Sequence, residues 1–271
     1  MAWLRPPMGE TSMLPSLFIS HGSPMTALRE SPGRQFLCGL GATLTRPKAV
    51  LVASAHWETM QPAVNAVSVN ETIHDFGGFP QALFDLRYPA PGAPEVADRV
   101  VEVLADAGLP CGIDPQRGLD HGAWVPLSLI WPDADIPVLQ ISIQPHLGPA
   151  HHLRLGRALA PLCAEGVLVI GSGSFTHNLR ILDREAMDAA ELPGSAAFAA
   201  WFDAALVGSR IDDLLAYRSL APAAAEQHPT DEHLLPVFVA LGAAGDGARA
   251  KRLHSSVEFG ALRMDSYAFS A

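Results

Sequence analysis

Four short apolar runs, rich in Val, Ile and Leu, recur along the first two thirds of the chain. They cover Ser16–Ser20, Ala49–Ser54, Pro137–Ile143 and Val167–Ile170. Short apolar runs bounded by turn residues are typical of strands that are buried on both faces of a parallel sheet. We therefore expect these segments to form the centre of one sheet.

Other segments carry apolar residues at helical spacing. Pro94–Gly108 places Val96, Val100 and Leu104 on one face, and its glycine ends the pattern. Four more helices are expected. Gly166 is predicted to be the C-terminal cap of the second of these, and Thr230 the N-cap of the last. The further predicted helices are Val125–Trp131, His151–Glu165, Ser195–Leu220 and Asp231–Gly242.

Strands that alternate with helices predict an α/β fold. A chain of 271 residues can bury one large core, so we expect a single domain with a central, mostly parallel or mixed sheet and helices on both faces. The alternating pattern of Arg252–Phe269 adds an antiparallel hairpin or edge strands. Residues 1–13 are expected to be an N-terminal extension, and residues 14–271 the folded domain.

Charge and cysteine content narrow the partners and the compartment. Lys and Arg number 18 against 28 Asp and Glu, a net charge of −10, so nucleic acid and anionic membrane surfaces are not expected partners. No apolar run is long enough to span a membrane, and the first 13 residues do not resemble a signal segment. Cys38, Cys111 and Cys163 are widely spaced, which predicts free core thiols in a reducing compartment, and hence a cytoplasmic protein with a small-molecule partner.

Three of the 11 histidines follow predicted strands. His21 follows SLFIS, His56 follows VLVASA, and His177 follows VLVIGSGSFT. Ligands bind at the carboxyl edge of parallel strands, so the common position favours one shared site. The alternative for each histidine is an ordinary hydrogen-bonded loop residue.

The segment HPTDEHLLP offers a fourth candidate, either Glu232 or His233. Successive helical residues are ~100° apart, so only one of the two is expected to face a metal; a helix-surface position is the alternative for His233. Several imidazoles in one cleft suit Zn, Fe, Cu or Ni better than Mg or Ca. The pair His151–His152, at the start of a predicted helix, is expected to face solvent rather than a metal.

Two further segments carry chemistry. His121 is expected in a loop before a helix, with Asp120 near enough to orient an imidazole, although a capping or core role is the alternative. Residues 73–80, IHDFGGFP, are glycine-rich and aromatic. They predict a mobile flap over a planar ligand, with a plain surface loop as the alternative.

Together these motifs resemble the class III extradiol ring-cleavage dioxygenases, and the DOPA dioxygenase-like branch in particular. The resemblance covers about Leu14 to Phe269 with six motifs in the order of that family. They are HGSP from His21, SAHW from Ser54, HDFGGFP from His74, HGAWVPL from His121, GSGSFTHNL from Gly171 and HPTDEHLLP from His228.

The resemblance implies an enzyme that cleaves a catecholic ring beside its diol with O2, giving a muconic semialdehyde-type product. It implies a metal, Fe(II) for activity, held by His21, His56 and His233, and no organic cofactor. It makes His177 the acid/base residue and, where zinc is bound, a further ligand. His121 matches a catalytic histidine at the substrate end of the site.

The wider superfamily has a glutamate as its third ligand. A histidine there makes the ligand set neutral, so Zn(II) stays open as the bound or native metal. Residues 178–181, NLRI, also differ from the motif of plant pigment-forming members, which leaves the physiological catechol open. The alternatives in other classes are a zinc hydrolase that activates water and a metal-dependent binding or storage protein. The sequence marks no oligomer interface.

Overall fold

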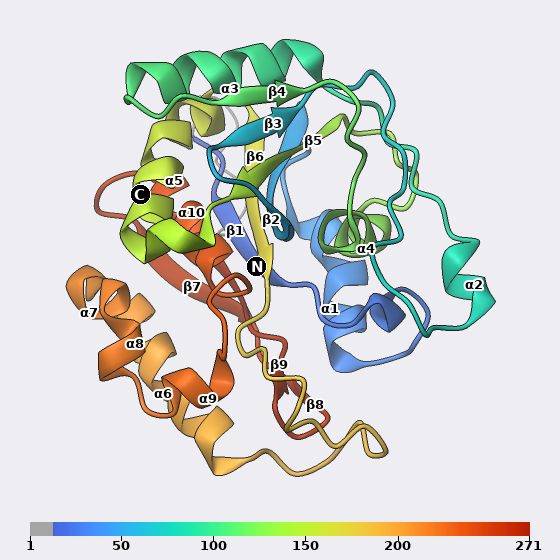
Figure 1. Cartoon of the computed structure of the whole chain (residues 1–271), viewed down its shortest axis with the longest axis vertical. Coiled ribbons are helices and arrows are strands. Elements are labelled where there is room, and N and C mark those ends of the chain that lie inside the picture. Colours follow the sequence, from blue (N-terminus) through green and yellow to red (C-terminus); the bar gives the residue numbers. More distant parts are fainter. Residues whose placement is uncertain (1–12) are drawn as a thin grey trace.

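The computed structural model describes residues 13–271 (Figure 1). An eight-stranded sheet crosses the molecule, with a two-stranded ribbon beside it. Its strands are β1 (Ser16–Ser20), β2 (Ala49–Glu58), β3 (Ala63–Asn65), β4 (Gly112–Asp114), β5 (Val138–Ile143), β6 (Val167–Gly173), β7 (Arg249–His254) and β10 (Ser266–Ser270), and the ribbon pairs β8 (Val257–Glu258) with β9 (Leu262–Arg263).

Ten α-helices surround the sheet in the described part of the chain, with three short 3-10 turns between them. The helices are α1 (Pro32–Leu40), α2 (Gln81–Phe84), α3 (Pro94–Asp106), α4 (His121–Ile130), α5 (Gly148–Ala164), α6 (Pro193–Val207), α7 (Ile211–Leu215), α8 (Tyr217–Leu220), α9 (Ala224–Gln227) and α10 (Leu235–Ala243).

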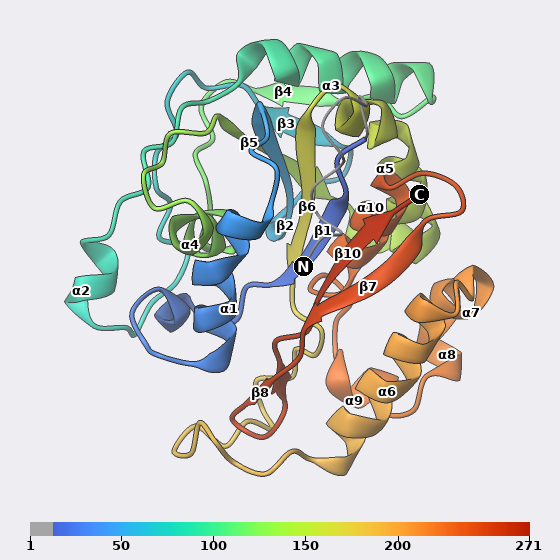
Figure 2. The same ribbon diagram turned by 180° about the vertical axis from the view of Figure 1, so that it is seen from behind.

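The strand order is β4-β3-β5-β2-β6-β1-β10-β7. The central strands β5, β2, β6 and β1 are mutually parallel, whereas β10 pairs antiparallel with β1 and β7 pairs antiparallel with β10. This arrangement confirms the predicted α/β fold with a mixed sheet. It also confirms the antiparallel C-terminal strands β10 and β7, which lie side by side next to β1 in Figure 2.

Helices cover both faces of the sheet, as predicted (Figures 1 and 2). Side chains alternate between the faces along each central strand, as they must in a pleated strand. Leu17, Val50 and Ile170 pack into a core shared with α1 and α4. Phe18 joins an aromatic core under α6 and α10, and Val169 joins the core under α3 and α5.

Several predicted boundaries are wrong in ways that move the candidate residues. Strand β2 continues to Glu58, so His56 lies within the strand rather than after it. Helix α4 begins at His121, so this histidine opens the helix instead of preceding it. Helix α10 begins at Leu235, and Thr230 does not cap it; His233 therefore lies in the turn before the helix.

The predicted helix Ser195–Leu220 is three helices, and the first of them ends just before Ser209, where the chain turns with a φ of 53°. By contrast, Gly166 has a φ of +92° just after α5, which confirms it as a helix C-terminal residue. The cysteines are free in the described residues, but Cys38 is exposed and only Cys163 is fully buried, so the prediction of three core thiols is wrong.

Two other predictions concern the N-terminal extension and membrane-spanning segments. The predicted extension, residues 1–13, lies outside the described residues except for Met13. Within residues 13–271, the structure holds no helix that is both long and apolar enough to cross a bilayer.

Candidate active site

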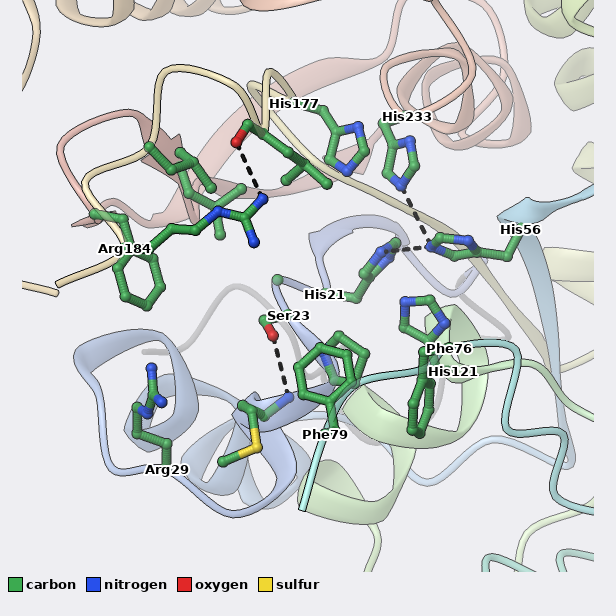
Figure 3. Close-up of a pocket in the computed structure, with 17 residues that line it drawn as sticks. His21, Ser23, Arg29, His56, Phe76, Phe79, His121, His177, Arg184 and His233 are labelled. Atoms are coloured by element: carbon green, nitrogen blue, oxygen red, sulfur yellow. Dashed lines mark hydrogen bonds between the residues drawn. The ribbon is translucent and has the colours of Figure 1, made fainter. Parts of the chain in front are cut away.

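Five histidines gather at the carboxyl edge of the central strands and line one cavity of about 390 Å³ (Figure 3). This volume falls within the range of small-molecule sites. His21 follows β1, His56 lies near the end of β2, and His177 comes four residues after β6. The remaining two are His121 and His233.

His21 is held by a serine of the neighbouring strand. Its Nδ1 lies 3.0 Å from the Oγ of Ser172, a residue of β6 that is fully buried. The Ser172 hydroxyl donates to the carbonyl oxygen of Gly122, so towards His21 it can only accept. His21 therefore carries its proton on Nδ1 and presents the Nε2 lone pair to the cavity.

His233 is fixed in the same way by its neighbour. Its Nδ1 lies 2.9 Å from Oε1 of Glu232, and a carboxylate accepts only, so Nε2 is again the free nitrogen. The backbone of His233 is also tied to β6, because the Ser174 N–H donates to its carbonyl oxygen at 2.8 Å. A Cβ on Gly173 would collide with that oxygen, which explains why the GSGS motif needs a glycine there.

His56 stands on a buried polar network. The backbone N–H of His56 donates to Ser54 Oγ at 3.2 Å, and the Ser54 hydroxyl donates to Asp120 Oδ1 at 2.7 Å. Asp120 also accepts from Gln140 at 2.7 Å and from Arg117 at 3.0 Å. With its oxygens occupied in this way, Asp120 supports the strand that carries His56, rather than orienting His121 as the sequence suggested.

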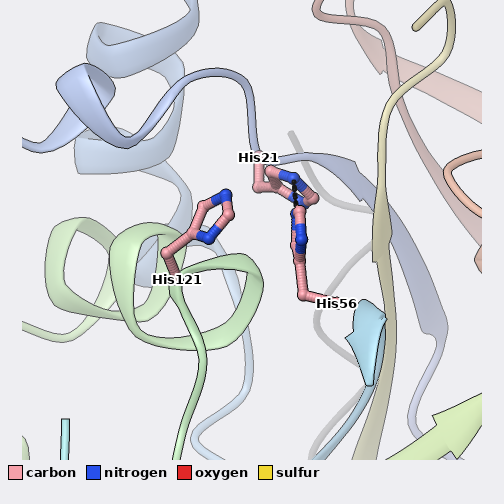
Figure 4. Close-up of side chains that lie close together, drawn as sticks. All are labelled: His21, His56 and His121. Carbon is pink, nitrogen blue, oxygen red and sulfur yellow. Dashed lines mark hydrogen bonds between the residues drawn. The ribbon is translucent and has the colours of Figure 1, made fainter. Parts of the chain in front are cut away.

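Asp75, from the predicted flap, is the residue that orients His121. One carboxylate oxygen accepts from His121 Nδ1 and the other accepts from its backbone N–H, both at 3.0 Å. Figure 4 shows the His121 ring, carried by the first turn of α4, facing His21 and His56. Phe76 and Phe79 of the same loop line the cavity, so the loop does border the site; its mobility stays a prediction.

His177 stacks on His233, with ring centroids 3.3 Å apart and an angle of 13° between the planes. Its Nδ1 lies 3.9 Å from Oε1 of Glu232, the same oxygen that accepts from His233. Glu232 therefore faces the Nδ1 atoms of two adjacent imidazoles from outside the cavity lining.

Burial makes these imidazoles hard to protonate. Burial first, and then repulsion from neighbouring imidazoles, lowers the pKa of His21 and of His233 well below the usual value. Burial likewise lowers the pKa of His56 and of His177 to about 4 each. All four imidazoles are therefore neutral at neutral pH.

The three Nε2 nitrogens at the centre fit a metal ion. His56 Nε2 lies 3.1 Å from His21 Nε2 and 3.3 Å from His233 Nε2, so the lone pairs of His21 and His233 point at the same nitrogen of His56. Nitrogens about 2.1 Å from one ion, at angles of about 90–110°, lie about 3.0–3.4 Å apart. A cation between them removes the repulsion of facing lone pairs, so the geometry and the donor chemistry both suit a transition metal.

The five histidines predicted for the site all line this cavity, and the pair His151–His152, expected from the sequence to face solvent rather than a metal, is not part of the lining. His152 is buried rather than exposed, and it bonds the backbone of Gly148 and Gln144. Sequence reasoning missed Ser172 and Asp75 as partners of the imidazoles. A serine inside the otherwise apolar run VLVIGSG was the available signal for the first.

Residues 16–269 match the family described as the catalytic LigB subunit of aromatic ring-opening dioxygenase. The chain belongs to this family. It is 46% identical over 266 residues to a 4,5-DOPA dioxygenase extradiol of Beta vulgaris, covering 97% of this chain and 98% of the relative. It is 40% identical over 258 residues to the protein of that name from Escherichia coli K12, covering 94% of each.

The fold agrees with this membership. The crystal structure of an uncharacterized protein from Escherichia coli K12 superposes with a TM-score of 0.79 at 35% identity, covering 94% of this chain and 99% of that one. The prediction of an extradiol ring-cleaving dioxygenase is confirmed, as is the prediction of a metal-dependent enzyme of the LigB family with a histidine site. A hydrolase or a storage protein is not supported.

Proposed function

We propose that this LigB-family enzyme opens a side-chain-bearing catechol beside its diol, using a metal held by His21, His56 and His233. The observation that carries the proposal is the convergence of the three Nε2 atoms of these histidines at one end of a cavity. The relatives named 4,5-DOPA dioxygenase extradiol support a DOPA-like catechol as the substrate.

The bound metal would hold the two catechol oxygens and O2 together, which removes most of the entropy cost of their encounter. Fe(II) is the metal expected for this chemistry. Zn(II) suits the same neutral nitrogens, so metal analysis of protein purified without chelators decides what the chain carries.

His177 is proposed as the acid/base residue. Its Nδ1 faces Glu232, which leaves Nε2 available to take the proton of a catechol hydroxyl and to return it as the ring opens. His121, fixed by Asp75, presents its own Nε2 to the diol end of the cavity. Phe76 and Phe79 would border the aromatic ring and exclude water from it.

The test is reconstitution of the protein with Fe(II) without oxygen, followed by air and a panel of catechols. Ring opening gives a yellow semialdehyde and consumes one O2 for each catechol. Absence of both for every catechol, with iron bound, contradicts the proposal.

The His177→Gln variant separates catalysis from metal binding. We expect nearly full metal content with turnover lost by about 100-fold or more, the usual contribution of a positioned acid/base. Loss of the metal instead would make His177 a ligand. The matched control is His151→Gln, a histidine that does not line the cavity.

We also propose a cytoplasmic location, on the basis of the free cysteines of the described residues.

A further inference from the structure

The cavity has two chemically different ends. Figure 3 shows the five histidines on one side and Arg29 and Arg184 on the opposite side. The lining also contains apolar side chains, Met25, Phe79 and Leu182 among them. A flat ring bound at the histidine end would extend any side chain towards the arginines.

Within residues 13–271, the cavity wall carries positively charged side chains and no acidic ones. Among the described residues that form the cavity wall, none is an Asp or a Glu. Arg29 and Arg184 are therefore the permanently charged side chains of this wall, and both are positive, in a protein whose net charge is −10. An anion would be attracted to this end, and an ammonium group would find repulsion and no partner.

Both guanidinium groups keep donors free. Arg184 donates one N–H to the carbonyl oxygen of Leu179 at 3.2 Å, and a guanidinium has further N–H groups. Arg29 lies over the ring of Phe259, 5.8 Å from its centroid, which fixes its position without using its donors. Neither takes part in an ion pair within residues 13–271, although Glu258, which does not line the cavity, interacts electrostatically with Arg29.

We propose that Arg29 and Arg184 form a carboxylate-binding subsite, so that the enzyme selects catechols whose side chain ends in a carboxylate and discriminates against catecholic amines. The assignment rests on the proposed function, because the histidine end is taken as the diol end. An amino group on the same side chain gains nothing from this wall, so a plain arylpropanoate should serve at least as well as an amino acid.

Binding without turnover tests the subsite directly. Monophenols lack the second hydroxyl and cannot be cleaved, so calorimetry on the metal-loaded enzyme can compare 3-(4-hydroxyphenyl)propanoate, 4-ethylphenol and tyramine. These ligands share one ring and differ in ending as a carboxylate, a methyl group or an ammonium. We expect affinity to fall in that order.

The Arg29→Gln/Arg184→Gln double variant should bind the propanoate roughly 10–50-fold more weakly, since both arginines are exposed and each contact is worth less than a buried pair. Its affinity for 4-ethylphenol should stay within about twofold. Arg180→Gln is the matched control: Arg180 is an exposed arginine of the same loop as Arg184 and does not line the cavity.

The matching catechols give a second measurement. With 3-(3,4-dihydroxyphenyl)propanoate the double variant should raise KM and keep kcat, whereas with 4-ethylcatechol both constants should match those of the wild type. Equal binding of tyramine and the propanoate by the wild type, or an equal loss for 4-ethylphenol in the double variant, overturns the subsite. Failure to cleave any catechol refutes the proposed function instead, and the binding order still decides the subsite.

Discussion

The serine that holds His21 gives the sharpest test of how this metal site is built. In Ser172→Ala, the Nδ1 proton of His21 loses its acceptor and the carbonyl oxygen of Gly122 loses its donor. Both partners belong to buried residues, and each unsatisfied group costs about 1–3 kcal/mol. The free energy of unfolding of the metal-free variant should therefore be about 2–6 kcal/mol lower than that of the metal-free wild type. A loss of this size is comparable with or smaller than the usual stability of a domain.

The second consequence concerns the metal. Without the serine, the His21 ring can turn and carry its proton on Nε2, the nitrogen that faces His56. Loss of such a supporting hydrogen bond typically weakens metal binding about 10–100-fold. Competition with a chromophoric chelator measures this affinity, and urea unfolding of the metal-free protein measures stability separately.

Ser174→Ala is the matched control. Ser174 is also buried at the end of β6, but its hydroxyl donates to the carbonyl oxygen of Thr176 at 2.7 Å and contacts no histidine. We expect this variant to lose about 1–3 kcal/mol of stability with metal affinity unchanged. Equal metal affinities for Ser172→Ala, Ser174→Ala and the wild type would refute the argument that Ser172 sets the tautomer of His21.

Two further substitutions test the other supports of the site. In Asp75→Asn, an amide can face His121 Nδ1 as a donor, which favours the wrong tautomer; kcat should fall about 10–100-fold with metal content retained, and a proportional loss of metal would show that Asp75 acts on the ligands instead. In Gly173→Ala, the new Cβ pushes on the His233 carbonyl, so stability should fall by about 1–3 kcal/mol and metal affinity with it. Gly77→Ala, where a Cβ meets open space, is the control and should match the wild type in both measurements.

Local pattern is sufficient for the sheet centre. The run Ser16–Ser20 forms β1 with the predicted bounds, because a strand buried on both faces is apolar throughout and a turn residue ends it. The same logic predicts His21 and His177 at one edge of the sheet, where both lie. The prediction is wrong for the end of β2, since SAHWE continues the strand without a change in pattern that the sequence could reveal.

Residues around His233 show why the rest could not be predicted. Asp231 to His233 has the composition of a first helical turn, and the predicted helix therefore begins too early. In the structure the His233 carbonyl accepts from the Ser174 N–H at the end of β6. A contact between segments about 60 residues apart in sequence overrides the local preference, and no local pattern reports it.

The hydrogen-bond partners of the His21 and His121 imidazoles also come from distant segments, so local patterns could not predict them. These partners affect how the site works. Each of His21, His121 and His233 gives its Nδ1 proton to an acceptor outside the cavity and keeps Nε2 for the centre. Two of the acceptors are carboxylates: Glu232 lies behind His233, and Asp75 lies behind His121. The negative charge of Glu232 would stabilise a divalent cation held by His21, His56 and His233 from one imidazole ring away, while that of Asp75 would keep His121 in the tautomer whose Nε2 faces the substrate.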